Sequence, residues 1–157
     1  MDFYNTPHVR SNNADNKFSE SFTLNIHNNT SVEQNNKVSS DIWKELGSEY
    51  DVREATFDEI CKISNKLYEA GEITLREHAI LTFDYDRATK DIIGIARNLG
   101  REVSPSYSMY ATESNGNGER DWIAEYEARI KQDFKQNNMI GYHNNKKILD
   151  ILNELDG

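Results

Sequence analysis

The first residues that could do chemistry are two aspartates in "DYDRATKDIIGI", which runs from Asp84 to Ile95. Asp84 and Asp86 take positions 1 and 3 of a calcium-binding EF-hand loop. Position 6 is Thr89, where that loop needs glycine, and position 12 is Ile95, where it needs a bidentate glutamate. The spacing instead indicates solvated carboxylates near the start of a helix, which the helix dipole favours.

The histidines and the single cysteine form no recognisable metal-binding or catalytic motif. The four histidines make neither a HExxH motif nor an i, i+4 ligand pair: His8, His27, His78 and His143. Cys61 lies on the apolar face of a predicted helix, which favours burial as a small hydrophobe, because a nucleophilic thiol needs exposure and a positive neighbourhood. We therefore predict no catalytic, cofactor-binding or metal-binding residues, and expect that the protein is not an enzyme.

The charge and composition limit the class of partner and the location. The chain of 157 residues has a formal net charge of -9. An acidic chain argues against nucleic acid and against anionic membrane as partners, because both attract clustered Lys and Arg. The N-terminus lacks a basic start followed by an apolar run, and no segment approaches the roughly 20 apolar residues that span a bilayer. We expect a soluble, cytoplasmic protein whose partner is another protein.

Residues 1–38 differ in composition from the rest of the chain. Runs such as "HNNTSVEQNNK" are rich in Asn and Ser, which favour turns, and offer few apolar groups to offset the entropy of ordering. One exception is "SFTLNIH", where Phe22, Leu24 and Ile26 alternate with polar residues at the period of a strand. We predict a disordered arm that can contact a partner through these three side chains, by adding a strand to the edge of a partner's sheet.

Two helix starts with the same signature stand eighteen residues apart in "TFDEICKISNKLYEAGEITLREHAILTF". Thr56 precedes Glu59, and Thr74 precedes Glu77, at the spacing of a capping box. Gly71 ends the first of these helices. The short connection predicts that the two helices pack as neighbours.

Each predicted helix carries an apolar stripe that we expect to face a common core. The stripes are Ile42, Trp43 and Leu46; Phe57, Ile60, Cys61, Ser64, Leu67 and Tyr68; Leu75, Ala79, Thr82 and Phe83, widened by Ile80 and Leu81; and Ala88, Ile92, Ile95, Ala96 and Leu99. "DYD" either breaks the chain before the last of these helices, which we favour, or lies within one long helix. Beyond the loop that follows, Trp122, Tyr126, Ile130 and Phe134 predict one helix, and Ile148, Ile151, Leu152 and Leu155 predict another.

The resulting prediction is a mainly α protein, a small bundle of five to six short helices with a disordered N-terminal segment. The helical domain covers residues 39–157, with a first helical subregion at 39–100, a loop or linker at 101–118 and a helical hairpin at 119–156. Tyr107 and Tyr110 lie in that loop. Loop tyrosines can dock a partner, or they can anchor the loop to the bundle.

The run from Trp43 to Asp84, with "YDVREATFDEI" and "LYEAGEITL", resembles a family of small uncharacterised proteins of Bacillus-type bacteria in which "YDVRNATFEEL" and "LYEAGEISL" recur. The resemblance covers about a quarter of the chain. It implies a bacterial cytosolic helical protein and transfers no functional residues.

Three functions follow from these observations. The first is a helical protein-interaction module without catalytic activity, whose N-terminal arm contacts a partner. The alternative is an acidic mimic of nucleic acid that inhibits a nuclease or a regulator, although interspersed Lys and Arg weigh against it. The third is an enzyme with a cryptic carboxylate site, which would need a carboxyl group of strongly raised pKa in a concave pocket.

Overall fold

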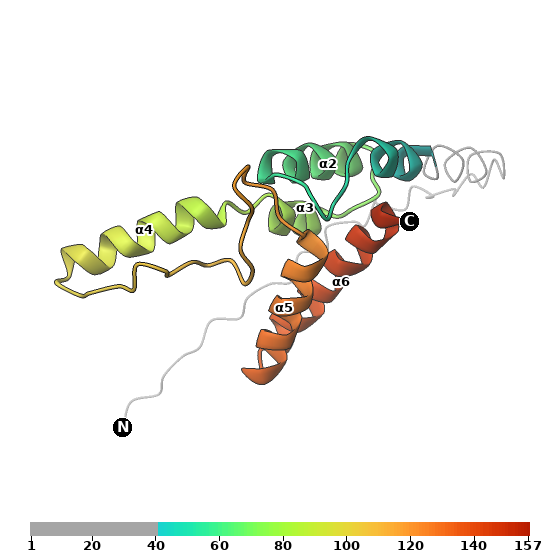
Figure 1. Cartoon of the computed structure of the whole chain (residues 1–157). Helices are drawn as coiled ribbons and strands as arrows, with labels where there is room; N and C mark the ends of the chain where they lie inside the picture. The colour runs from blue at the N-terminus through green and yellow to red at the C-terminus, as the bar shows by residue number, and fades with distance from the viewer. Residues whose placement is uncertain (1–40) are drawn as a thin grey trace, which may run out of the picture.

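The computed structural model describes residues 41–157, and all of its regular structure there is helical (Figure 1). The N-terminal arm, with Phe22, Leu24 and Ile26, and the predicted Ser39 or Ser40 cap lie outside these residues. The helices are the segment 41–49, α2 (Phe57–Glu69), α3 (Leu75–Leu81), α4 (Tyr85–Asn98), α5 (Trp122–Lys135) and α6 (Met139–Asp156). The predicted small helical bundle is confirmed.

Both predicted capping boxes are present. Thr56 Oγ1 accepts from the Glu59 N–H at 3.3 Å, and Glu59 Oε2 accepts from the Thr56 N–H at 2.8 Å. Thr74 and Glu77 repeat these contacts at 3.3 and 2.7 Å. Gly71, with φ of 78°, takes the left-handed conformation that lets the chain leave α2 at little steric cost. The local signals in the sequence therefore fix where α2 ends and α3 begins.

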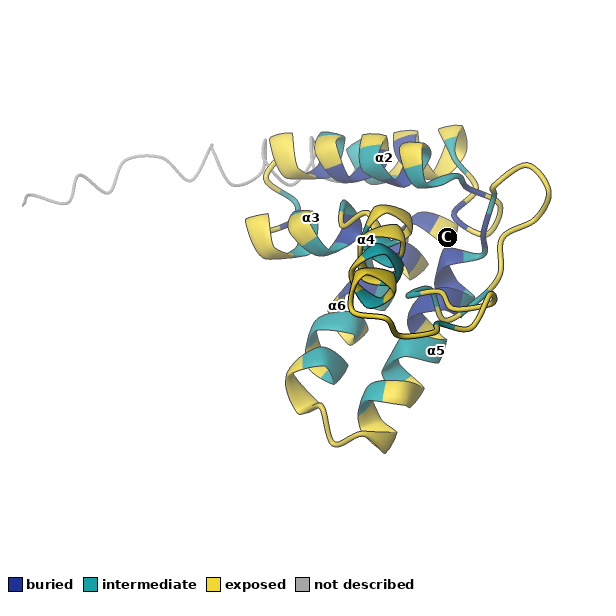
Figure 2. Cartoon of the chain, turned by 90° about the vertical axis from the view of Figure 1, so that its left-hand side faces the viewer, coloured by how far each residue is buried: buried dark blue, intermediate teal, exposed yellow. Residues whose placement is uncertain are grey.

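The core lies between α2 and the ends of α5 and α6 nearest to it (Figure 2), and Leu46 of the 41–49 helix and Leu81 of α3 belong to it. Its fully buried members include Leu46, Ile60, Ile63, Leu67, Tyr126, Ile148 and Leu152. Trp122 joins the core to the segment before α2, since its indole N–H donates to the Ala55 carbonyl at 2.8 Å. α5 and α6 form the predicted antiparallel pair, joined by a tight turn at Asn137 with φ of 55°. The far ends of both helices, near this turn, are exposed.

The break before α4 is confirmed, but the predicted burial of the α4 stripe is wrong. α3 ends at Leu81, and the Asp84 carboxylate caps α4 by accepting from the Arg87 N–H at 2.8 Å. Within the described part of the chain α4 has no buried residue, and its apolar side chains Ile95 and Leu99 are 60% and 69% exposed. The break turns α4 away from the bundle, and among the described residues only the loop that follows α4 runs beside it (Figure 1).

No helix among residues 41–157 combines the length and the apolar composition that crossing a bilayer requires.

Candidate functional site

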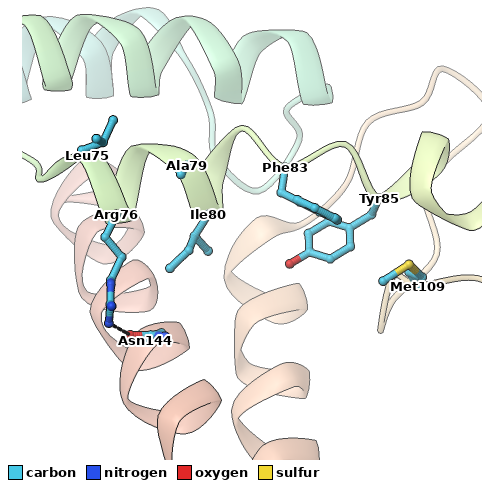
Figure 3. Close-up of a pocket in the computed structure, with 8 residues that line it drawn as sticks. All are labelled: Leu75, Arg76, Ala79, Ile80, Phe83, Tyr85, Met109 and Asn144. Carbon is cyan, nitrogen blue, oxygen red and sulfur yellow. Dashed lines mark hydrogen bonds between the residues drawn. The ribbon is translucent and has the colours of Figure 1, made fainter.

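An apolar groove opens where α3 meets the start of α4 (Figure 3). It has a volume of about 860 Å³. Its lining residues are Leu75, Arg76, Ala79 and Ile80 from α3, Phe83 and Tyr85 from the break and the start of α4, Met109 from the following loop, and Asn144 from α6. A groove of this size and apolar lining is the usual form of a binding site.

The groove exists because α3 does not bury the stripe that its sequence predicts. Of that stripe only Leu81 is fully buried, and Ile80 is half-buried. Leu75 is 64% exposed and Phe83 is 46% exposed, contrary to the expectation that both face the core. α3 has only seven residues, so one helical face meets α2 while the other, uncovered in the described structure, forms the groove wall.

The break between α3 and α4 places two aromatic rings at the groove. Phe83 and Tyr85 stand edge to face with ring centroids 4.7 Å apart. Arg129 packs against the face of the Tyr85 ring, and its guanidinium lies 3.8 Å from the ring centroid. Such cation–π contact restricts the ring and strengthens when it is partly desolvated.

The opposite wall is a loop, and a fully buried carboxylate holds it in place. Glu125 is 0% exposed and accepts from the backbone N–H groups of Ala111 and Thr112 at 3.0 and 2.7 Å. It also accepts from the Thr112 hydroxyl at 2.6 Å and from Arg129 Nε at 2.7 Å. A buried charge persists only when it is paired and hydrogen-bonded in this way, so the loop and α5 are bound to one another.

Arg129 links the buried Glu125 to the groove wall. Its Nη2 donates to the Met109 carbonyl at 3.0 Å, and the Met109 N–H donates to Thr89 Oγ1 of α4 at 3.0 Å. Met109 is thus held on both sides of its backbone. Arg120 Nη1 lies 3.7 Å from Glu125 Oε2 and donates to Thr112 Oγ1 at 3.0 Å. We call Glu125, Arg129 and Arg120 the ionic cage, because the three charges together hold the loop.

The two tyrosines predicted to bind a partner lie in different surroundings. Tyr110 is half-buried and packs into the fold: the Arg120 guanidinium lies 3.8 Å from its ring centroid, and the Trp122 ring centroid is 6.1 Å away. Burial raises the pKa of Tyr110 to about 12, so the phenol stays neutral. Tyr107 is 39% exposed on the same loop. Neither belongs to the groove lining, although Tyr110 contacts Tyr85, at 5.4 Å between centroids.

One end of the groove is positively charged. Arg76 Nη1 lies 3.5 Å from Asn144 Oδ1, a long contact, and among the described residues it makes no ion pair with a carboxylate. The groove therefore offers an apolar floor and, at one end, a guanidinium that is available to an acidic group.

Neither Cys61 nor His78 lines the groove, and His8 and His27 lie outside the described residues. Cys61 is partly buried, and desolvation raises its pKa, which disfavours the thiolate. His78 Nδ1 is 2.9 Å from Ser64 Oγ, and the ring stacks on Tyr68 at 4.9 Å. Among residues 41–157 no cluster of His, Cys, Asp or Glu could hold a metal ion.

Sequence reasoning missed the charged residues that hold the groove wall and mark the end of the groove. Glu125 looks like any of the many acidic residues on helix surfaces, and only Arg129 four residues later gives a weak signal of a pair. Arg76 carries no signal at all, because its position depends on how α3 meets α6. Comparison with protein families, curated proteins and solved structures finds no significant match to this chain.

Proposed function

We propose that this protein is a protein-interaction module whose groove binds an apolar segment of a partner protein that also carries a carboxylate. The observation that supports it most is the combination of Leu75 and Phe83, exposed and apolar, with the uncompensated charge of Arg76 at the groove's end. Exposed apolar patches with a polar rim are typical of interaction sites. The Arg76 guanidinium, which makes no ion pair with a described residue, supplies the orientation, because Arg pairs carboxylates in a defined geometry.

The groove walls are held in place by defined contacts, which supports a binding site rather than a mobile surface. The ionic cage fixes Met109, and Arg129 fixes Tyr85, before any partner arrives. A preformed site loses less conformational entropy on binding, so more of the contact energy remains as affinity. The predicted arm, with Phe22, Leu24 and Ile26, would add a second contact to the same partner, and the exposed Tyr107 a third.

We assign the groove to binding and not to catalysis, because its polar side chains are Arg76, Asn144 and the Tyr85 phenol, and burial raises the pKa of Tyr85. The alternative of a nucleic-acid mimic has less support. Such a mimic needs free carboxylates in rows, whereas Arg53 pairs with Asp156 at 2.9 Å and Lys66 pairs with Glu49 at 2.8 Å. The proposal also keeps the expected cytoplasmic location, where a partner protein is accessible.

The test is selection of peptides from a displayed random library of roughly twelve residues against the full chain, followed by fluorescence anisotropy with the selected peptides. We expect enrichment of apolar anchors together with Asp or Glu. Leu75→Asp should weaken binding at least about tenfold, because it places a charge against the apolar anchor. Arg76→Ala should weaken binding less and reduce its salt dependence.

The matched control is Ile140→Asp. Ile140 is 75% exposed, stands in the first turn of α6 as Leu75 stands in the first turn of α3, and is outside the groove. An aspartate is compatible with the helix dipole at both positions, so neither variant should unfold the protein. Equal loss of binding in the two variants, or selected peptides without acidic residues, would count against the proposal.

A further inference from the structure

The exposed face of α4 has the residue spacing of a helix-pairing seam. Ala88, Ile92, Ile95 and Leu99 follow one another at steps of four, three and four, which is the a/d spacing of a heptad repeat. Ile92, Ile95 and Leu99 are 39%, 60% and 69% exposed. The loop that returns beside α4 is attached at a position outside this seam, through the Met109 N–H on Thr89 Oγ1. The seam is thus open to another helix.

We propose that the partner of this seam is α4 of a second copy of the chain, packed antiparallel. If Ile92 of one copy faces Ile95 of the other, then Ala88 faces Leu99 at both ends of the contact. Each layer then matches an a position with a d position, and the smallest side chain lies opposite the largest. The contact is the same from either copy, as a two-fold symmetric dimer requires.

The charge of α4 permits two copies to meet there. The chain as a whole carries -9, so most surfaces of two copies repel each other. Residues 84–101 carry four basic and three acidic side chains, a net charge of +1. At the seam's edge, Asp91 of one copy would lie beside Asn98 of the other, a pair that can hydrogen-bond and does not repel.

Geometry selects the antiparallel direction. α4 projects from the bundle with its C-terminal end free (Figure 1). Parallel pairing would bring both bundles, each carrying most of the negative charge, to the same end of two helices that lie only about 8–10 Å apart. Antiparallel pairing places the bundles at opposite ends and opposes the two helix dipoles favourably. This inference is independent of the groove's proposed function.

The expected affinity is modest. A helix of 14 residues is about 21 Å long and offers two heptads, fewer than the three to four that sustain a strong coiled coil. We therefore expect dimerisation in about the micromolar to submillimolar range. Sedimentation velocity of the full chain across that range measures it directly, with a rise of the weight-average mass from monomer toward dimer.

Two variants make the test specific. Ile95→Asp should weaken the dimer at least about tenfold, whereas Ile140→Asp, which replaces the same residue type at a more exposed site on α6, should leave it unchanged. Circular dichroism confirms that both remain folded. A chain that stays monomeric at all concentrations, or a dimer that survives Ile95→Asp, overturns the proposal.

Disulfide trapping tests the direction of pairing. In a Cys61→Ala background, a mixture of Ala88→Cys and Leu99→Cys chains should oxidise mainly to the mixed dimer, because these positions face each other only in the antiparallel arrangement. Predominance of the two like-with-like disulfides would show parallel pairing and refute the antiparallel model of the seam.

Discussion

Replacing Glu125 by glutamine tests whether the ionic cage holds the groove wall. The carboxylate is 0% exposed, lies 2.7 Å from Arg129 Nε and 3.7 Å from Arg120 Nη1, and accepts from two backbone N–H groups. Glutamine keeps the shape but brings an NH₂ group into a site where every neighbour is a donor. Two guanidiniums would then lose their counter-charge while their side chains remain only 13% and 8% exposed.

Removal of one member of a buried ion pair costs about 3–5 kcal/mol, and partial hydration of the arginines places Glu125→Gln near the lower end, at about 3 kcal/mol. Urea unfolding followed by Trp fluorescence measures the loss. Glu127→Gln is the control, because its carboxylate is 52% exposed and its pair with Lys131 is long, at 3.7 Å, so it should change stability by no more than about 0.5 kcal/mol. Equal effects of the two substitutions would refute the structural role of the cage.

Four further predictions test the elements that frame the site. Thr56→Ala removes an N-cap and should lower the free energy of unfolding by about 1 kcal/mol in urea titration. The pKa of Glu59 lies below its ordinary value of 4.5 because the Thr56 N–H and hydroxyl donate to the carboxylate. The ionised carboxylate therefore stabilises the folded state above pH 4.5, and this stabilisation is lost as the pH falls through the folded pKa. Glu59→Gln should thus flatten the loss of stability between about pH 5 and pH 3. Gly94→Ala should stabilise α4 by about 0.5–1 kcal/mol, because an added Cβ meets nothing within 4 Å. Gly71→Ala should destabilise the protein by a similar amount or more, because Gly71 has a positive φ. Thermal melts of the two variants should therefore shift in opposite directions. Tyr126→Phe removes a buried hydroxyl that has no hydrogen-bond partner among the described residues, so its melting temperature should equal or exceed that of the wild type.

The fold could be predicted where the signals are local. The capping boxes at Thr56 and Thr74 and the glycine at 71 act within a few residues, and each lies where the sequence places it. Whether the α4 stripe is buried or exposed does not depend on local signals. Periodicity shows that a face is apolar, but not what covers it, and a three-residue break before Tyr85 sends the helix away from the core.

The candidate site could hardly be predicted at all. Its apolar side chains were predicted to lie in the core, because Leu75 and Phe83 fit the helical stripe of α3. The role of Glu125 depends on contacts with a loop 13 and 14 residues earlier in the chain, which no spacing rule identifies. Tyr110 was recognised as a residue of interest, and the structure places it against Arg120 as part of the loop's anchorage.

The central claim is that the groove beside α3 receives a partner segment. Methyl NMR of the full chain during titration with a library-selected peptide tests it most directly. We expect the methyl signals of Leu75, Ile80 and Met109 to shift together and to saturate at one affinity, while that of Ile140 stays in place. Shifts confined to residues outside the groove, with these three methyl signals unmoved at saturation, would contradict it.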